Sequence, residues 1–138
     1  MTSEPYTVDD GSQGPSGANN AADVADVEAV VRDYIDSWHT GDEHRMERCL
    51  DDDLVKRGII KASPTPGVLS RVTKTQMVEW TRGGGGRSPE AEAKVLVHHV
   101  EGGLASAQVA TEEYLDLLHL AKTSGTWRIV HDLFRQSD

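Results

Sequence analysis

The chain has 138 residues, and its 14 Lys and Arg against 23 Asp and Glu give a formal net charge of −9. This length fits one domain, and an acidic chain gains nothing from counterion release on DNA or RNA, so we expect no nucleic-acid partner. No apolar run reaches the roughly 18 residues of a membrane span, and the N-terminus lacks a signal-peptide layout. We therefore expect a cytoplasmic protein with no membrane partner. The single cysteine, Cys49, excludes an internal disulfide.

The N-terminal segment differs in composition from the rest of the chain. Residues 1–22 are rich in Gly, Ser, Pro and Asn and contain few apolar side chains. Such a composition buries too little surface to offset its ordering entropy. We predict a disordered tail over residues 1–22 and one folded domain over residues 23–138.

A helix with one buried face is predicted after this tail. Apolar side chains recur there every third or fourth residue, which is the helical spacing: Val24, Val27, Val31, Tyr34 and Trp38. Asp23 is the expected N-cap and Gly41 the expected end. The two aromatic residues at the end of the stripe are either core residues or the walls of a cavity.

Two further elements follow. A short helix is predicted from Asp42 to Leu50, with Cys49 as an unreactive packing residue. The run LVKRGII at 54–60 is typical of a strand, in which Lys56 and Arg57 point to opposite faces. Which of the two side chains reaches inward stays open.

A third helix and a glycine run occupy the middle of the chain. Residues 73–81 predict the helix, and Trp80 lies on its apolar side. The four glycines at 83–86 predict a mobile loop, because they bring no side chain and maximal backbone freedom. A flap at the mouth of a cavity is one role that such a loop can have.

Two hairpins complete the domain. Residues 93–101 and 104–114 predict two strands joined by Gly102 and Gly103. In the last third of the chain, two apolar runs flank Ser124 and Gly125, which is again typical of a hairpin.

The register of the last hairpin follows from a two-residue loop, because Thr123 then pairs with Thr126. The face richer in large apolar side chains is assigned to the core: Tyr114, Asp116, Leu118, Leu120, Trp127, Ile129, His131 and Leu133. This places Asp116 diagonal to His131. A carboxylate among apolar walls has a raised pKa, so Asp116 and His131 are candidate proton carriers. Alternatively, a buried Asp–His hydrogen bond has a purely structural role.

Other chemistries lack their motifs. Six histidines are present, but no His-x-His or His-Glu-x-x-His spacing occurs, and His98 and His99 diverge on a strand. We therefore predict no metal site and no cofactor. The Gly-x-Ser-x-Gly pattern of hydrolases is also absent.

Three stretches of the chain carry a family resemblance: VVRDYIDSWHTGD (Val30–Asp42), DLVKRGI (Asp53–Ile59) and EEYLDLLHLAKTSGTWRIVHDLF (Glu112–Phe134). They resemble the nuclear transport factor 2-like (NTF2-like) superfamily, and most closely its "putative lumazine-binding" branch, near the SnoaL-like polyketide cyclases and ketosteroid isomerase. The resemblance covers residues 22–135. It implies an α+β cone, in which three N-terminal helices pack on a strongly curved, mostly antiparallel sheet that encloses a pocket.

The resemblance also implies a set of residues that face the cavity: Tyr34, Trp38, Trp80, Asp116 and His131. To the ligand-binding candidates among them we add Tyr114 and Arg57, and we assign any catalysis to Asp116 and His131. The open sheet face is expected to form a homodimer.

Three functions remain open because this superfamily hosts many. The first is a domain that binds a small hydrophobic or aromatic ligand in an aromatic-lined pocket. The second is a cofactor-free isomerase, dehydratase or cyclase, and the third is a non-catalytic dimerisation module.

Overall fold

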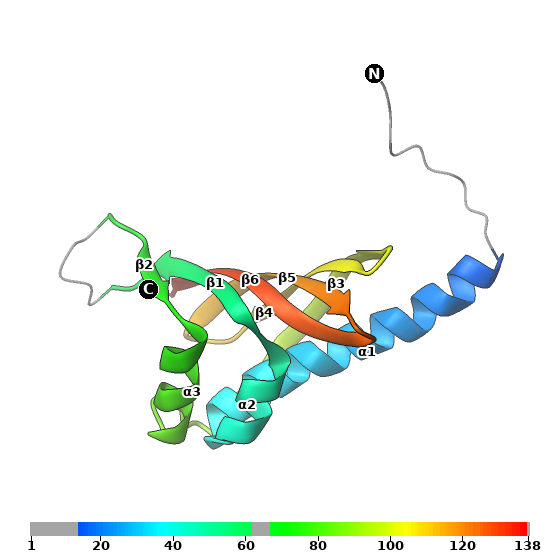
Figure 1. Ribbon diagram of the computed structural model, residues 1–138. Coiled ribbons are helices and arrows are strands. Elements are labelled where there is room, and N and C mark those ends of the chain that lie inside the picture. The colour runs from blue at the N-terminus through cyan, green and yellow to red at the C-terminus, as the bar shows by residue number, and fades with distance from the viewer. Residues whose placement is uncertain (1–13, 62–66, 138) are drawn as a thin grey trace.

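The protein folds into helices on one side of a curved sheet. The computed structural model describes residues 14–61 and 67–137 (Figure 1). The elements in these residues are α1 (Gly14–Thr40), α2 (Glu43–Cys49), β1 (Leu50–Ile59), β2 (Ser70–Val72), α3 (Lys74–Arg82), β3 (Lys94–Glu101), β4 (Leu104–Ala110), β5 (Tyr114–Thr123) and β6 (Thr126–Gln136). The predicted α+β cone, with three helices and an unclosed, mostly antiparallel sheet, is confirmed.

The sheet has the strand order β2-β1-β6-β5-β4-β3, and only β1 and β6 run parallel among its neighbours. The helices lie together on one side of it, with α1 running beneath the strands (Figure 1). The face turned toward the helices is the inner face of the sheet. Among the described residues, no helix covers the other face, which is the outer face.

Helix α1 supplies the main contact with the inner face. Val27 and Val31 are fully buried, as the apolar stripe predicts, and the small side chains of Ala105 and Ala107 on β4 are buried with them. Small residues on the sheet allow the helix to approach closely, so this pairing forms one end of the core.

The beginning of α1 differs from the expectation. The helix begins at Gly14, so residues 14–22 are helical and not part of a disordered tail; residues 1–13 lie outside the described residues. Asp23 lies inside the helix and is no N-cap. Its carboxylate instead accepts hydrogen bonds from Trp127 Nε1 at 3.2 Å and Lys122 Nζ at 3.1 Å, which fastens α1 to the end of the sheet.

The two short helices agree closely with their sequence signals. Asp42 caps α2 by accepting from the backbone N–H of Arg45 at 3.1 Å. Thr73 caps α3 in a capping box with Gln76. Strand β1 begins earlier than expected, at Leu50, so the three aspartates at 51–53 belong to the strand.

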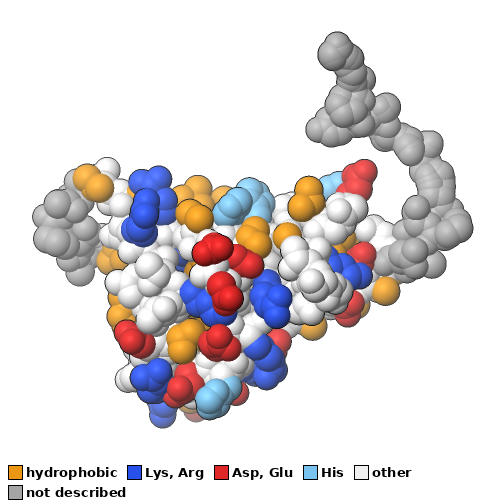
Figure 2. Space-filling view, viewed as in Figure 1, with side chains coloured by type: hydrophobic (Ala, Val, Ile, Leu, Met, Phe, Trp, Pro, Cys, Tyr) orange, Lys and Arg blue, Asp and Glu red, His pale blue; other side chains and the backbone are white. Residues whose placement is uncertain are grey.

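Charged side chains gather over the helical part of the surface. Figure 2 shows acidic and basic side chains interspersed there. They include the ion pairs of Arg45 with Asp33 at 2.7 Å and of Lys74 with Asp52 at 2.9 Å. Ion pairs that are partly open to solvent, as these two are, contribute little to stability, so this face is a solvated surface. No helix of the described residues is long and apolar enough to cross a membrane. The cytoplasmic location stays a prediction.

The last hairpin has the expected turn. Thr123 pairs with Thr126, and Ser124 and Gly125 both have positive φ angles, 52° and 79°. Positive φ at both loop positions is the type I′ geometry, which matches the twist of the two strands. The predicted register is therefore correct from the turn as far as the pair Leu120 and Ile129.

A β-bulge then changes the register. Leu120 pairs with Ile129, but the next residue, His119, pairs with His131, so Val130 is an extra residue in β6. One extra residue exchanges the two faces of the strand beyond it. The prediction that His131 and Leu133 face the core is therefore wrong, and Asp132 and Phe134 take the inner positions.

Candidate functional site

The bulge brings Asp132 to the inner face beside Asp116. Both aspartates are buried. Strand β1 adds Lys56, which lies on the same buried face of the strand as Leu54 and Gly58. Tyr34 approaches from α1. These four residues, Tyr34, Lys56, Asp116 and Asp132, form the polar cluster, and each residue is at most 5% exposed.

Lys56 lies at the centre of the polar cluster. Its Nζ donates to Asp132 Oδ2 at 2.6 Å and to the Tyr34 hydroxyl at 2.8 Å, and it lies 3.3 Å from Asp116 Oδ2. The Tyr34 hydroxyl lies 2.9 Å from Asp116 Oδ2 and 3.0 Å from Asp132 Oδ2. Its single proton serves one carboxylate at a time.

The charges in the polar cluster do not balance when both carboxyls are ionised, because one ammonium faces two carboxylates. Burial raises the pKa of Asp132 well above its ordinary value, opposed by Lys56 and assisted by the charge of Asp116. Oδ1 of Asp132 is buried and has no hydrogen-bond partner among the described residues. The cluster therefore favours retaining one extra proton.

The other two members of the polar cluster keep their protons. Burial raises the pKa of Tyr34 well above its ordinary value, and the neighbouring carboxylates add to the effect. Burial alone would lower the pKa of Lys56, but attraction to Asp132 and Asp116 outweighs it, so the pKa of Lys56 is raised. Tyr34 and Lys56 thus present hydrogen-bond donors at neutral pH.

A cavity of about 90 Å³ lies over the polar cluster, between the sheet, α1 and α3. Its lining includes most of the predicted ligand-binding residues, namely Tyr34, Trp38, Trp80 and Tyr114, together with Asp116. Phe134 adds another aromatic wall, with its ring 4.2 Å below Lys56 Nζ. The cavity is thus aromatic on its walls and polar at its floor.

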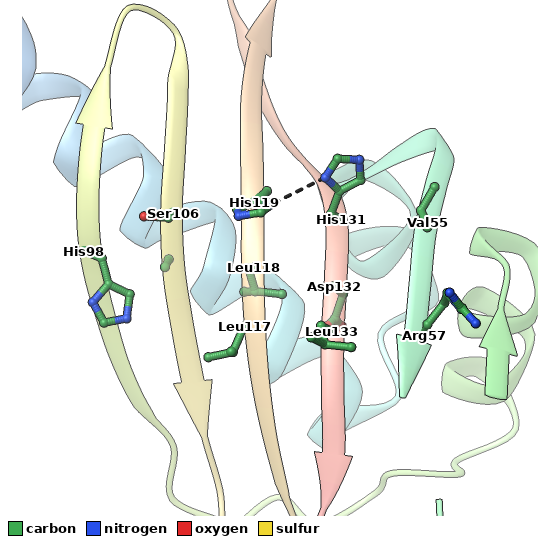
Figure 3. A pocket seen from close by; sticks show the side chains of 11 residues that line it. Val55, Arg57, His98, Ser106, Leu117, Leu118, His119, His131, Asp132 and Leu133 are labelled. Atoms are coloured by element: carbon green, nitrogen blue, oxygen red, sulfur yellow. Dashed lines mark hydrogen bonds between the residues drawn. The ribbon is translucent and has the colours of Figure 1, made fainter. Parts of the chain in front are cut away.

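Two predicted site residues lie elsewhere. Arg57 and His131 line a groove on the outer face of the sheet (Figure 3). The expected pair of Asp116 and His131 does not form, because the bulge turns His131 away from the core. For Arg57, strand alternation turns it outward when Lys56 turns inward.

Lys56 and Asp132 are site residues that the sequence-based predictions do not include. The signal for Lys56 was present, since it stands two residues after Leu54 and shares its face. Asp132 could not be found by counting from the turn, because Val130 carries no feature that marks it as a bulge.

Cys49 has no part in this site. It is 2% exposed, and its thiol donates to the carbonyl oxygen of Met46 at 3.3 Å. Burial raises the pKa of Cys49 to about 12, so the thiol stays protonated. The interpretation as an unreactive packing residue agrees with this geometry.

The comparisons with known proteins agree with the fold described above. The family described as "Putative lumazine-binding" matches residues 22–135. The chain belongs to this family. A search of curated proteins gives no match.

Solved structures of similar fold come from several bacteria. An NTF2-like protein of unknown function from Silicibacter pomeroyi DSS-3 is 19% identical, with a TM-score of 0.71 over 86% of this chain and 98% of its own. A second, from Shewanella baltica OS155, is 18% identical, with a TM-score of 0.74 over 86% of this chain and 96% of its own. A domain with a cystatin-like fold from Nostoc punctiforme PCC 73102 is 18% identical, with a TM-score of 0.62 over 85% of this chain and 78% of its own. At these identities the likeness establishes the NTF2-like fold alone.

Proposed function

We propose that the cavity binds a small planar molecule that has a polar edge. The observation that carries this proposal is the polar cluster beneath aromatic walls. Trp38 and Trp80 offer flat apolar surfaces, while Lys56 and Tyr34 offer donors and Asp116 offers an acceptor. A few convergent polar groups in an aromatic pocket are typical of sites that orient a ligand.

Lumazine, for which the family is named, has the matching chemistry. It is a flat pair of fused rings with carbonyl and N–H groups along one edge, so it can both accept from Lys56 and donate to Asp116. We use it as the reference compound, with other planar heterocycles as its alternatives.

The size of the cavity limits the ligand. About 90 Å³ is well below the roughly 300 Å³ at the lower end of pockets for drug-sized molecules. Trp80 is 43% exposed although it lines the cavity, so it stands at the boundary with solvent. A two-ring ligand would enter by displacing Trp80 outward, and it would leave little room for substituents.

A thermal-shift panel of lumazine and other planar heterocycles tests this proposal. At a ligand concentration near 100 times Kd, binding adds about 2.7 kcal/mol and raises the unfolding midpoint clearly. The shift should disappear in Trp38→Ala and persist in Leu133→Ala, whose side chain lies on the outer face. A shift that survives Trp38→Ala would place the ligand elsewhere.

Proton-transfer catalysis is the second candidate, in line with the isomerases, dehydratases and cyclases of the superfamily. The observation that favours it is the buried carboxyl pair of Asp116 and Asp132, in which burial raises the pKa of Asp132 well above its ordinary value. Asp116 borders the cavity and would be the proton acceptor; Tyr34 or Lys56 would donate to a developing oxyanion. Turnover lost in Asp116→Asn while binding remains would support this function.

We also propose that the outer face of the sheet joins two copies of the chain. Large apolar side chains lie half-exposed there, including Val55, Leu117 and Leu133 around a groove of about 500 Å³. Exposed apolar side chains gathered on one uncovered sheet face are typical of an association surface. A dimer is compatible with ligand binding, because the cavity opens on the opposite face.

A further inference from the structure

The β-bulge at Val130 creates a second constellation on the outer face. It makes His119 and His131 direct neighbours on the two central strands, β5 and β6. Their Nδ1 atoms face each other at 3.3 Å, and both side chains are exposed (Figure 3). The two rings stand nearly edge to face, at an interplanar angle of 71°.

This separation is the one that a tetrahedral metal ion requires. Two imidazole nitrogens bound to Zn²⁺ at about 2.0–2.1 Å with a tetrahedral angle between them are about 3.3–3.4 Å apart. The 3.3 Å between the two Nδ1 atoms falls at this value without any movement of the strands. Because the two histidines stand on neighbouring strands, their backbones are held at a fixed spacing, and metal binding costs little conformational entropy.

We propose that His119 and His131 form a bidentate site for a divalent transition metal of the zinc type. Both rings would carry their proton on Nε2, so that each Nδ1 lone pair faces the ion. A neutral imidazole carries a single N–H, so a ring that donates through Nδ1 in the metal-free pair must move that proton to its own Nε2 before its Nδ1 can bind the ion.

The surroundings allow a cation to enter. Arg57 is the fixed positive charge in the same groove, and it lies farther along β1, apart from the two rings (Figure 3). The overall charge of −9 favours cations in general. No group of three or more metal-binding side chains occurs in residues 14–61 and 67–137, so the remaining positions belong to water or to the same pair of a second copy. In both cases the two nitrogens of this chain remain ligands.

The sequence carries no sign of this site, because its two ligands are cross-strand neighbours twelve residues apart and match no metal motif. Without the extra residue in β6, His131 would face the core. The same bulge therefore turns Asp132 toward the polar cluster on the inner face and His131 toward His119 on the outer face.

Isothermal titration of tag-free protein with zinc chloride tests the proposal. Wild-type protein should bind Zn²⁺ and ignore Mg²⁺, which prefers oxygen ligands. His119→Gln and His131→Gln should each weaken zinc binding at least about tenfold, which corresponds to about 1.4 kcal/mol. Both side chains are exposed in the single chain and lie outside its core, so the circular-dichroism spectra of these variants should match that of the metal-free wild type.

His98→Gln is the matched control. His98 lines the same groove and is exposed, but its Nε2 contacts Gln108 at 2.9 Å and neither of the paired histidines. This variant should bind zinc within about twofold of wild type. The proposal is overturned if the double variant His119→Gln, His131→Gln binds zinc as wild type does, or if His98→Gln weakens binding equally.

Discussion

Lys56 Nζ lies 2.6 Å from Oδ2 of Asp132, in a part of the core where both side chains are almost inaccessible to solvent. A buried pair of this kind often adds little net stability over apolar residues, but the loss of one partner leaves the other charge without compensation. Lys56 lines the floor of the cavity, where the polar groups of this cluster can meet a ligand.

Lys56→Met should destabilise the fold strongly. The change leaves Asp116 and Asp132 buried without a counter-charge, so the free energy of unfolding at neutral pH should fall by about 3–5 kcal/mol. Urea denaturation measures this. Arg57→Met is the matched control, since Arg57 is the adjacent residue on the exposed side of β1, and it should change stability by at most about 0.5 kcal/mol. Equal effects of the two changes would contradict the account of the polar cluster.

The pKa of Asp132 predicts a pH dependence with a definite sign. Its pKa in the folded state is raised above the ordinary 3.8 of the unfolded state. At pH values between the unfolded-state pKa and the folded-state pKa, the folded state therefore binds more protons than the unfolded state. The contribution of Asp132 to stability is therefore present at low pH and is lost as pH rises through the raised pKa. Asp132→Asn should remove this loss, so its stability relative to wild type should increase from pH 4 upward.

Asp52→Asn provides a control of opposite sign. A hydrogen bond from Lys74 lowers the pKa of Asp52, so that the contribution of this carboxylate is present above its unfolded pKa and is lost as pH falls. Urea unfolding of both variants across pH 4 to 8 measures the two slopes. A relative stability of Asp132→Asn that stays constant or decreases with pH would refute the assignment.

The position of Trp38 depends on Gly86. A Cβ added at Gly86 would overlap the indole of Trp38. A Cβ at Gly83 would make only ordinary contacts, with the carbonyl oxygens of Glu79 at 3.5 Å and Trp80 at 3.8 Å. Gly86→Ala should thus displace the cavity wall, lower the free energy of unfolding by about 1–3 kcal/mol and shift the tryptophan emission. Gly83→Ala should leave the emission unchanged. The proposed packing would be wrong if both variants kept the wild-type spectrum.

The dimer proposal predicts a response to charge on the outer face. Leu117 is 46% exposed and lines the groove there, so Leu117→Lys should shift the sedimentation coefficient from dimer to monomer. Val68→Lys changes another exposed apolar residue, 58% exposed and away from this groove, and should leave the dimer intact. Sedimentation of the wild-type protein as a monomer would contradict the dimer proposal.

Much of the fold could be predicted because its signals are local. The valine stripe of α1, the cap residues Asp42 and Thr73, and the turn at Ser124 and Gly125 each depend on near neighbours in sequence. These features correctly place the buried face of α1, the beginnings of α2 and α3, and one end of the last hairpin. They also explain why the aromatic lining of the cavity, Tyr34 and Trp38 included, could be expected.

The candidate site was harder to predict, because its composition depends on a single extra residue. Val130 has a β-branched side chain, which is common in regular strands, and no glycine marks the bulge. Beyond it, every inward and outward assignment in β6 is exchanged. Asp132 therefore replaced His131 in the core, and the pair of His119 and His131 arose on the outer face.

Fluorescence titration of the Trp127→Phe variant tests the ligand-binding proposal most directly. The chain has three tryptophans, and this change leaves only Trp38 and Trp80, both of which line the cavity. Titration with lumazine and the other planar heterocycles of the panel should produce quenching that saturates for at least one compound, and Tyr34→Phe in the same background, which removes one proposed hydrogen-bond donor and keeps the ring, should weaken it. Quenching that rises linearly without saturation for every compound would contradict a ligand site in this cavity.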